Sequence, residues 1–136
     1  MSNIEAVIDL WKREGVQLLP PGDESELREI FRRIGVPLSR DVARLYSLTS
    51  GFPDTIDLRL FSLWTPGQIA INNPPGTPEP SFADHCIECF RYRLRFESSD
   101  ESSVHGGFED HPVAPSLDGF FALFLSKDVD ADLRLL

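Results

Sequence analysis

The first 52 residues place apolar side chains at the three- and four-residue spacing of amphipathic helices. The first stripe follows Ser2 and Glu5, which have the spacing of a capping box, and it predicts a helix. Two further stripes predict helices within residues 23–35 and 39–51. The three stripes consist of Ile4, Val7, Ile8, Trp11, Leu27, Ile30, Phe31, Ile34, Val42, Leu45, Tyr46 and Thr49. Because helices this short are not stable alone, we expect the rest of the chain to cover their apolar faces.

Each predicted helix has a start and a stop signal. Asp23 and Ser39 stand where the second and third helices need N-cap residues. The three stripes are followed by glycines, which we expect to end the helices; these are Gly15, Gly35 and Gly51.

The second half of the chain reads mainly as strands. Residues 56–64 have little polar interruption and predict a well-buried strand, followed by a helical turn over residues 65–69. A proline-rich loop covers residues 72–80. Residues 81–96 change from a helical period to an alternating one, which predicts a short helix that turns into a half-buried strand.

A short returning strand around Val104 and a last helix behind Ser116 complete the pattern. The order of helices, then strands, then a helix favours an α+β fold. We expect N-terminal helices and a C-terminal helix packed on a small, mainly antiparallel sheet, in a single domain over residues 1–136.

Composition and charge narrow the function classes. The chain has 136 residues, 41% hydrophobic and 26% charged, with a net charge of −9, which suits one soluble domain. Residues 1–68 carry a balance of −2 and residues 69–136 a balance of −7. An acidic half repels phosphate, so we expect no direct nucleic-acid contact, and it can speed encounter with a basic protein.

The sequence gives no sign of export or membrane insertion. No apolar run approaches the roughly 20 residues of a membrane span, and the N-terminus lacks a basic start followed by an apolar block. With two cysteines only, these features predict a cytoplasmic protein that does not bind membranes.

Two motifs raise the question of metal or redox chemistry. The C-x-x-C of Cys86 and Cys89 is half of a zinc site, and the chain has no second pair. The two thiols share an apolar helical stripe with Phe82 and Phe90, which favours buried small hydrophobes. The motif HGGFEDH, residues 105–111, fits no helical metal pattern and favours a glycine-rich turn. We therefore expect no metal, no cofactor and no catalytic residue.

Charged side chains in the second half are the candidates for partner binding. Asp100, Glu101, Glu109 and Asp110 flank the predicted strand of Val104 and would cluster at one rim if the two arms form a hairpin. These carboxylates form either a solvated loop or a protein-binding rim. Arg91, Arg93 and Arg95 alternate with aromatic and aliphatic residues. We expect these arginines to pair across strands with acidic neighbours, and their alternative role is a row that anchors an acidic or peptide partner.

The run LPPGDESELREIFRRIGVPLSRDVARLYSLTSG resembles the N-terminal signature of the SUKH superfamily, which includes Smi/Knr-type cell-wall regulators and bacterial immunity proteins. The family pattern is matched by Glu26 or Glu29, Gly35, Pro37-Leu38, Leu45-Tyr46 and Ser50-Gly51. FADHCIECFRYRLRF and VAPSLDGFFALFL resemble its central segment and closing helix. Leu-Pro is inverted here, and Ser50 and Phe52 replace the asparagine and a second glycine.

The resemblance implies a SUKH-like domain that binds protein and performs no catalysis. It implies an immunity protein that neutralises a cognate toxin of the basic nuclease type. The alternative is a Smi/Knr-type regulatory or scaffolding module acting in the cell's own pathways, and a metal-dependent enzyme is a third, weaker hypothesis.

Overall fold

The computed structural model describes residues 2–106 and 111–126, which form an α+β unit around a shared core. Five helices surround a five-stranded antiparallel sheet whose strand order is β1-β2-β3-β4-β5. In chain order the elements are α1 Asn3–Arg13, α2 Glu24–Ile34, α3 Arg40–Tyr46, β1 Phe61–Leu63, α4 Pro66–Asn72, β2 Ser81–His85, β3 Phe90–Phe96, β4 Ser102–Gly106, β5 His111–Ala114 and α5 Leu117–Leu125. The predicted α+β architecture is confirmed.

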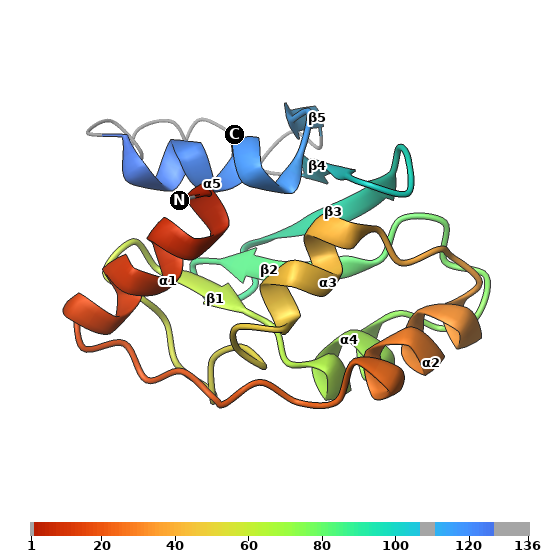
Figure 1. The fold of residues 1–136 in the computed structure, drawn as a ribbon, viewed down its shortest axis with the longest axis horizontal. Helices are drawn as coiled ribbons and strands as arrows, with labels where there is room; N and C mark the ends of the chain where they lie inside the picture. The colour runs from red at the N-terminus through yellow and green to blue at the C-terminus, as the bar shows by residue number, and fades with distance from the viewer. Residues whose placement is uncertain (1, 107–110, 127–136) are drawn as a thin grey trace.

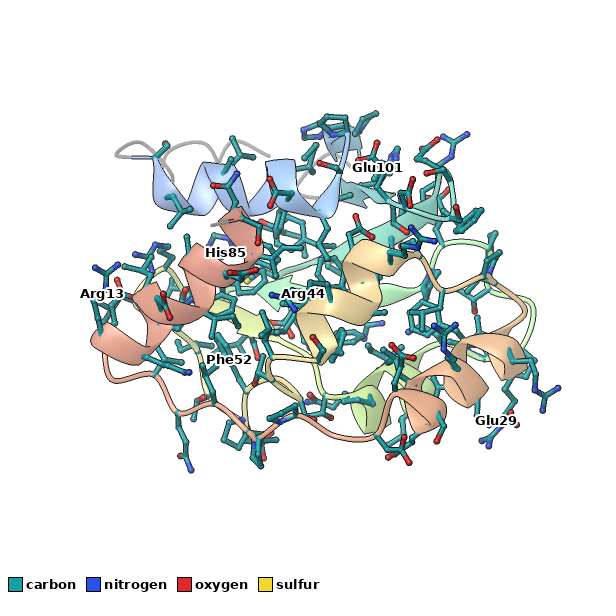
Figure 2. All side chains as sticks on the ribbon, in the orientation of Figure 1. Arg13, Glu29, Arg44, Phe52, His85 and Glu101 are labelled. Carbon is teal, nitrogen blue, oxygen red and sulfur yellow. The ribbon has the colours of Figure 1, made fainter. Side chains whose placement is uncertain are left out.

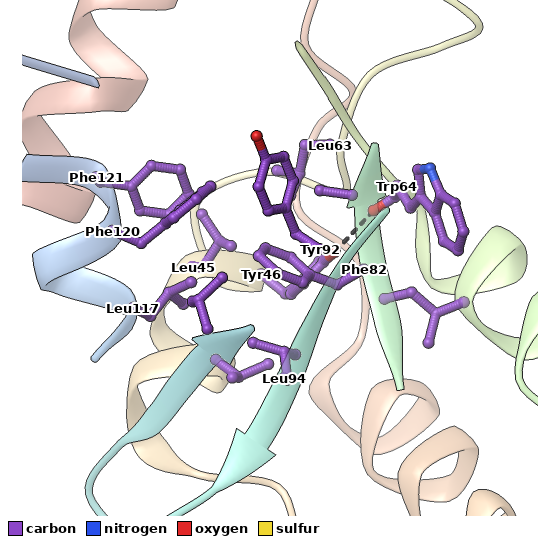
Figure 3. Packing of buried hydrophobic residues seen from close by; sticks show 14 of the residues in the cluster. Leu45, Tyr46, Leu63, Trp64, Phe82, Tyr92, Leu94, Leu117, Phe120 and Phe121 are labelled. Atoms are coloured by element: carbon purple, nitrogen blue, oxygen red, sulfur yellow. Dashed lines mark hydrogen bonds between the residues drawn. The ribbon is translucent and has the colours of Figure 1, made fainter. Parts of the chain in front are cut away.

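One face of the sheet is covered by helices. Figure 1 shows α1, α3 and α5 in front of the strands, with α2 and α4 together at one end of the molecule. Side chains that alternate toward the helices include Leu63, Tyr92 and Leu94, all buried. The ring of Tyr92 lies 5.1 Å from that of Phe120 of α5, which in turn lies against Phe121 (Figure 3). The opposite face of the sheet, called here the outer face, carries the alternate side chains of each strand, such as Arg91, Arg93 and Arg95 of β3.

The helix starts follow the predicted capping chemistry with one exception. The side-chain oxygens of Ser2, Asp23 and Ser116 accept backbone N–H groups of the first turns, and Thr65 forms a complete capping box with Gln68. The Ser39 hydroxyl makes no cap bond in α3, because it bonds the carboxylate of Asp41 and the hydroxyl of Ser102 instead.

The first and last helices are joined across the chain. The backbone N–H of Asn3 donates to Asp118 Oδ1 at 2.8 Å, and the Asn3 side-chain amide donates to Asp118 Oδ2 at 3.0 Å. The helix pair α1 and α5 closes the core over Trp11 and Phe121, whose rings meet edge to face.

The strand predicted over residues 56–64 is wrong in extent, since only Phe61–Leu63 is a strand. The Asp57 carboxylate turns the chain by accepting the backbone N–H groups of Arg59 and Phe61. Leu58 lies in this turn and is 74% exposed. The hydrogen bonds of Asp57 therefore form a turn where the apolar sequence predicted a strand.

The helix predicted at the start of residues 81–96 is also wrong, because β2 and β3 form a hairpin there. The ladder shifts register between Ser81 and Ala83, so Phe82 and Ala83 are both buried on the core side. This bulge explains why the apolar spacing imitates a helical stripe.

Gly51 does not end α3, which stops at Tyr46. Its φ is +100°, and a Cβ there would lie 2.9 Å from the carbonyl oxygen of Leu63. The glycine therefore lets the chain pass close to β1, where the N–H of Phe52 donates to the same oxygen at 2.9 Å.

Candidate interaction surface

The three arginines of β3 lie on the outer face of the sheet, and each has an acidic neighbour. Nitrogen–oxygen distances are 2.9 Å for Arg91–Glu88, 3.6 Å for Arg93–Glu79 and 3.8 Å for Arg95–Glu97. The predicted acidic neighbours are present, but the expected pairing across strands is wrong, because none of these three acidic partners lies on a neighbouring strand. The partners come from a turn, a loop and the end of the same strand, and the row is therefore not a field of uncompensated positive charge.

The predicted carboxylate rim is described only in part. Asp100 and Glu101 lie in the exposed turn between β3 and β4, where Asp100 pairs with Arg40 at 3.1 Å. The turn is fixed to α3, because the N–H of Asp41 donates to the Asp100 carbonyl oxygen at 3.1 Å. Glu109 and Asp110 lie outside the described residues.

The three arginines do not gather at one rim with the carboxylates, because they extend along the whole of β3. Arg95 lies beside the β3–β4 turn that carries Asp100, whereas Arg91 lies at the other end of β3, roughly 13 Å away along the strand. The three candidate arginines thus follow the length of the outer face, and the described candidate carboxylates, Asp100 and Glu101, lie in the turn at one end of it.

The end of the outer face near Arg91 contains a groove of about 430 Å³, called here the acidic groove. The loop before β1, the strands β1 and β2, the turn after β2 and helix α4 all contribute to it. Its lining residues are Asp54, Thr55, Ile56, Ser62, Trp64, Gln68, Asn72, Asp84, Ile87 and Glu88. This lining holds three carboxylates and no lysine or arginine.

Asp84 is the most firmly held carboxylate of the acidic groove, because it is buried and both of its oxygens accept hydrogen bonds. It is 6% exposed, and its Oδ2 accepts the Trp64 indole N–H at 2.6 Å. Its Oδ1 accepts the backbone N–H of Glu88 at 3.3 Å. The Arg91 guanidinium lies over the Trp64 ring, 5.0 Å from the centroid, and bounds this end of the groove with a cation–π contact.

Exposed apolar side chains gather around the same groove. The segments that line the groove carry five exposed apolar residues in all, from the loop before β1, from α4 and from the turn after β2: Ile56, Leu58, Leu60, Ile71 and Ile87. Ile56 and Ile87 line the groove itself, at 38% and 78% exposure. Apolar side chains around a polar centre are typical of binding surfaces.

A second cavity, of about 480 Å³, lies between α2, α3 and the start of α4. Two of its three acidic residues, Asp23 and Glu24, already serve their own helix, and Glu26 is the third. Asp23 caps α2, and the backbone N–H of Ser25 lowers the pKa of its carboxyl group; Glu24 pairs with Arg28 at 3.1 Å. It has no exposed large apolar side chain in its lining and is the weaker candidate.

The one serine–histidine contact near a cavity does not form an activated nucleophile in the described part of the chain. Ser103 Oγ donates to Glu97 Oε1 at 2.7 Å and lies 2.9 Å from His105 Nε2. Because the hydroxyl has one proton, His105 must donate to Ser103 in this arrangement. A histidine that donates to the hydroxyl cannot serve as its base.

The cysteine prediction is wrong. Cys86 and Cys89 are both exposed, in the turn between β2 and β3, and neither belongs to the core. The described residues contain no group of three or more histidine, cysteine, aspartate or glutamate side chains placed to hold a metal ion. His85 is buried, and its ring lies against Phe90 with centroids 5.1 Å apart.

Sequence reasoning did not find the acidic groove. Asp54 precedes β1, whereas Asp84 and Glu88 belong to β2 and the turn after it, so only the fold brings Asp54 to the other two. Charged side chains also lie on other elements, such as Glu29 on α2 and Arg44 on α3 (Figure 2). The exposed Ile87 in an otherwise polar turn was the one available signal.

Comparison with known proteins gives no family to which the chain can be assigned. No family model matches it, and no curated protein does. Among the described residues, no helix has the length and apolar character needed to cross a membrane.

Proposed function

We propose that this chain is a non-catalytic protein-binding domain that neutralises a basic toxin of the nuclease type. The observation that carries the proposal is the acidic groove with its exposed apolar surroundings. Three carboxylates line it, of which Glu88 is paired with Arg91 at the edge of the groove, and two exposed isoleucines lie in the same lining.

The chemistry of the groove selects a cationic partner. A lysine or arginine side chain entering it would meet Asp54, Asp84 and Glu88, while Ile56 and Ile87 would be covered by the partner's surface. Charge complementarity of this kind raises the association rate and fixes the partner's orientation. Covering the apolar side chains lowers the dissociation rate. The net charge of −9 adds long-range attraction for a basic protein.

The resemblance to the SUKH superfamily supports immunity as the biological setting. Nucleases hold phosphate groups with basic residues, so an acidic protein can occupy the same surface. A regulatory module of the Smi/Knr type would use the same groove for several weaker partners, and the number of partners distinguishes the two roles.

The test uses the product of the adjacent upstream reading frame as the toxin. We expect co-expression of this chain to rescue growth and the two purified proteins to bind one to one, with an association rate that falls as salt rises. Asp54→Asn combined with Glu88→Gln removes two exposed charges while leaving the buried Asp84 in place. We expect this variant to weaken binding by about tenfold or more, mainly through slower association.

The matched control makes the same chemical changes at the other end of the outer face. Asp100→Asn combined with Glu101→Gln also removes two carboxylates, from the β3–β4 turn. If this control weakens binding and the groove variant does not, the partner uses the rim predicted from sequence. Absence of rescue and of binding to that toxin, or multiple turnovers of any substrate by the pure chain, would overturn the proposal.

A further inference from the structure

The tip of the β2–β3 hairpin holds two cysteines in an unusual backbone conformation. His85 pairs with Phe90, and the four residues between them form the turn. Cys86, Ile87 and Glu88 have φ values of +57°, +53° and +64°. Three successive non-glycine residues in the left-handed region are costly, and such strain persists only where the surroundings enforce it.

Contacts on both sides hold the tip in place. The N–H of Cys86 donates to the Leu60 carbonyl oxygen at 2.8 Å, and the N–H of Cys89 donates to the His85 carbonyl oxygen at 3.1 Å. The Cys89 thiol donates to the carbonyl oxygen of Cys86 at 2.8 Å. Both cysteine residues are exposed to solvent.

The two cysteines stand at the two ends of one four-residue turn, and both are exposed. The hydrogen bond from the Cys89 thiol to the carbonyl oxygen of Cys86 keeps this thiol over the turn. A divalent cation that binds both sulfur atoms deprotonates both thiols. Thiolate sulfur favours soft or borderline ions such as Zn²⁺ over Mg²⁺ or Ca²⁺.

One chain does not complete such a site. A structural zinc ion takes four ligands in a tetrahedron. Among the described residues, no third histidine, cysteine or carboxylate is placed so that it could hold a metal ion together with the pair. His85 is turned away, with its Nδ1 3.4 Å from the hydroxyl of Tyr92 in the interior.

We propose that Cys86 and Cys89 form one half of a tetrahedral zinc–thiolate site, and that a second copy of this chain supplies the other half. A two-fold axis through the metal brings two identical hairpin tips together. Ile87, which is 78% exposed between the two cysteines, then packs against its counterpart. Arg91, paired with Glu88 at 2.9 Å, offsets part of the negative charge of four thiolates.

The contact between two hairpin tips is too small to hold a dimer without the metal, because stable interfaces bury on the order of 1,200 Å² or more. The site therefore predicts a dimer that forms with zinc and separates when the metal is removed. The zinc-linked dimer and the proposed toxin complex would both cover Ile87, so the two states compete for this surface. Metal binding by the isolated chain is measured without the toxin, so either proposal can fail alone.

The experiment uses the full chain, reduced with a phosphine under anaerobic conditions and titrated with Co²⁺ and then Zn²⁺. We expect one metal ion for every two chains, thiolate-to-cobalt charge-transfer absorption, and a doubling of mass by light scattering that a chelator reverses. Cys86→Ser and Cys89→Ser should each abolish all three signals. Far-ultraviolet circular dichroism of the metal-free variants, expected to match the parent, verifies that they fold.

Glu88→Gln is the matched control, because it changes the residue beside Cys89 and removes a carboxylate while keeping both thiols. We expect it to retain the metal and the dimer. One metal ion per chain with unchanged mass, metal binding that survives Cys86→Ser, or no binding at micromolar Zn²⁺ would each overturn the proposal.

Discussion

Substitution of Asp57 by asparagine should lower the free energy of unfolding strongly, although the two side chains have nearly the same shape. Its carboxylate is buried and accepts four hydrogen bonds. Oδ1 accepts the backbone N–H groups of Arg59 and Phe61 at 2.7 Å and 3.0 Å, and Oδ2 accepts the Trp11 indole N–H at 2.8 Å and the Arg59 guanidinium at 3.3 Å. These bonds join α1 to the turn that precedes β1.

Asp57→Asn keeps the size of the side chain and replaces one acceptor oxygen with a donor. If the amide oxygen serves the two backbone groups, the NH2 group faces the donors of Trp11 and Arg59. Losing the bond to a buried indole and leaving it unsatisfied costs about 1–3 kcal/mol. Removing the buried charge beside Arg59 adds to this, although Arg59 keeps Glu14 at 2.7 Å. We expect a total loss of about 3–4 kcal/mol.

The assay is urea unfolding followed by tryptophan fluorescence and circular dichroism, with the midpoint falling and the slope unchanged. Asp54→Asn is the control, since this residue is exposed and its φ of +50° suits asparagine. We expect the control to stay within about 0.5 kcal/mol of the parent. A cost below about 1 kcal/mol for Asp57→Asn would refute the assigned role of the buried carboxylate.

Three further perturbations test the fold. Gly51→Ala should lower the free energy of unfolding by about 3 kcal/mol in the same urea assay, because a Cβ at φ +100° meets the Leu63 carbonyl; an unchanged midpoint would contradict the close approach. The hydrogen bond from Arg59 lowers the pKa of Glu14 below its usual 4.5, so this carboxylate stabilises the fold above pH 4.5 and loses its effect as pH falls through the lowered value. Glu14→Gln should therefore lower the free energy of unfolding at pH 7, and the variant should lose less stability than the parent as the pH falls below 4.5 in urea titrations. Equal losses in the two proteins would contradict the stabilising role of the ionised Glu14. Burial raises the pKa of Tyr46 and Tyr92 above the usual 10, so the folded state loses stability as pH rises beyond 10. Tyrosinate absorbance should appear together with the loss of circular dichroism, and a tyrosinate signal in the folded protein would refute it.

The helices could be predicted because their signals are local. Ser2, Asp23 and Ser116 cap the helices that follow them, and the apolar stripes of α1 and α2 match the buried residues. The strands could be predicted less well, because their limits depend on groups distant in the sequence. Asp57 turns a stretch that reads as a strand, since its carboxylate binds Trp11, 46 residues away.

The candidate surface shows the same division. The pairing of the β3 arginines with acidic residues follows from the density of negative charge around them. The acidic groove does not, because α4 and the turn after β2 reach it only through the order of strands. The cysteines were misplaced because a bulge at Phe82 and a four-residue turn together reproduce helical spacing.

The hydrogen bonds between Asn3 and Asp118 have a consequence for synthesis on the ribosome. They join residues 115 positions apart, and the apolar side of α1 is covered largely by α5. During translation, α1 must therefore wait for nearly all of the described chain before its final neighbour emerges. Contacts of such long sequence separation slow folding, and a chaperone that shields Ile4, Val7 and Trp11 during that interval would raise the yield of native protein.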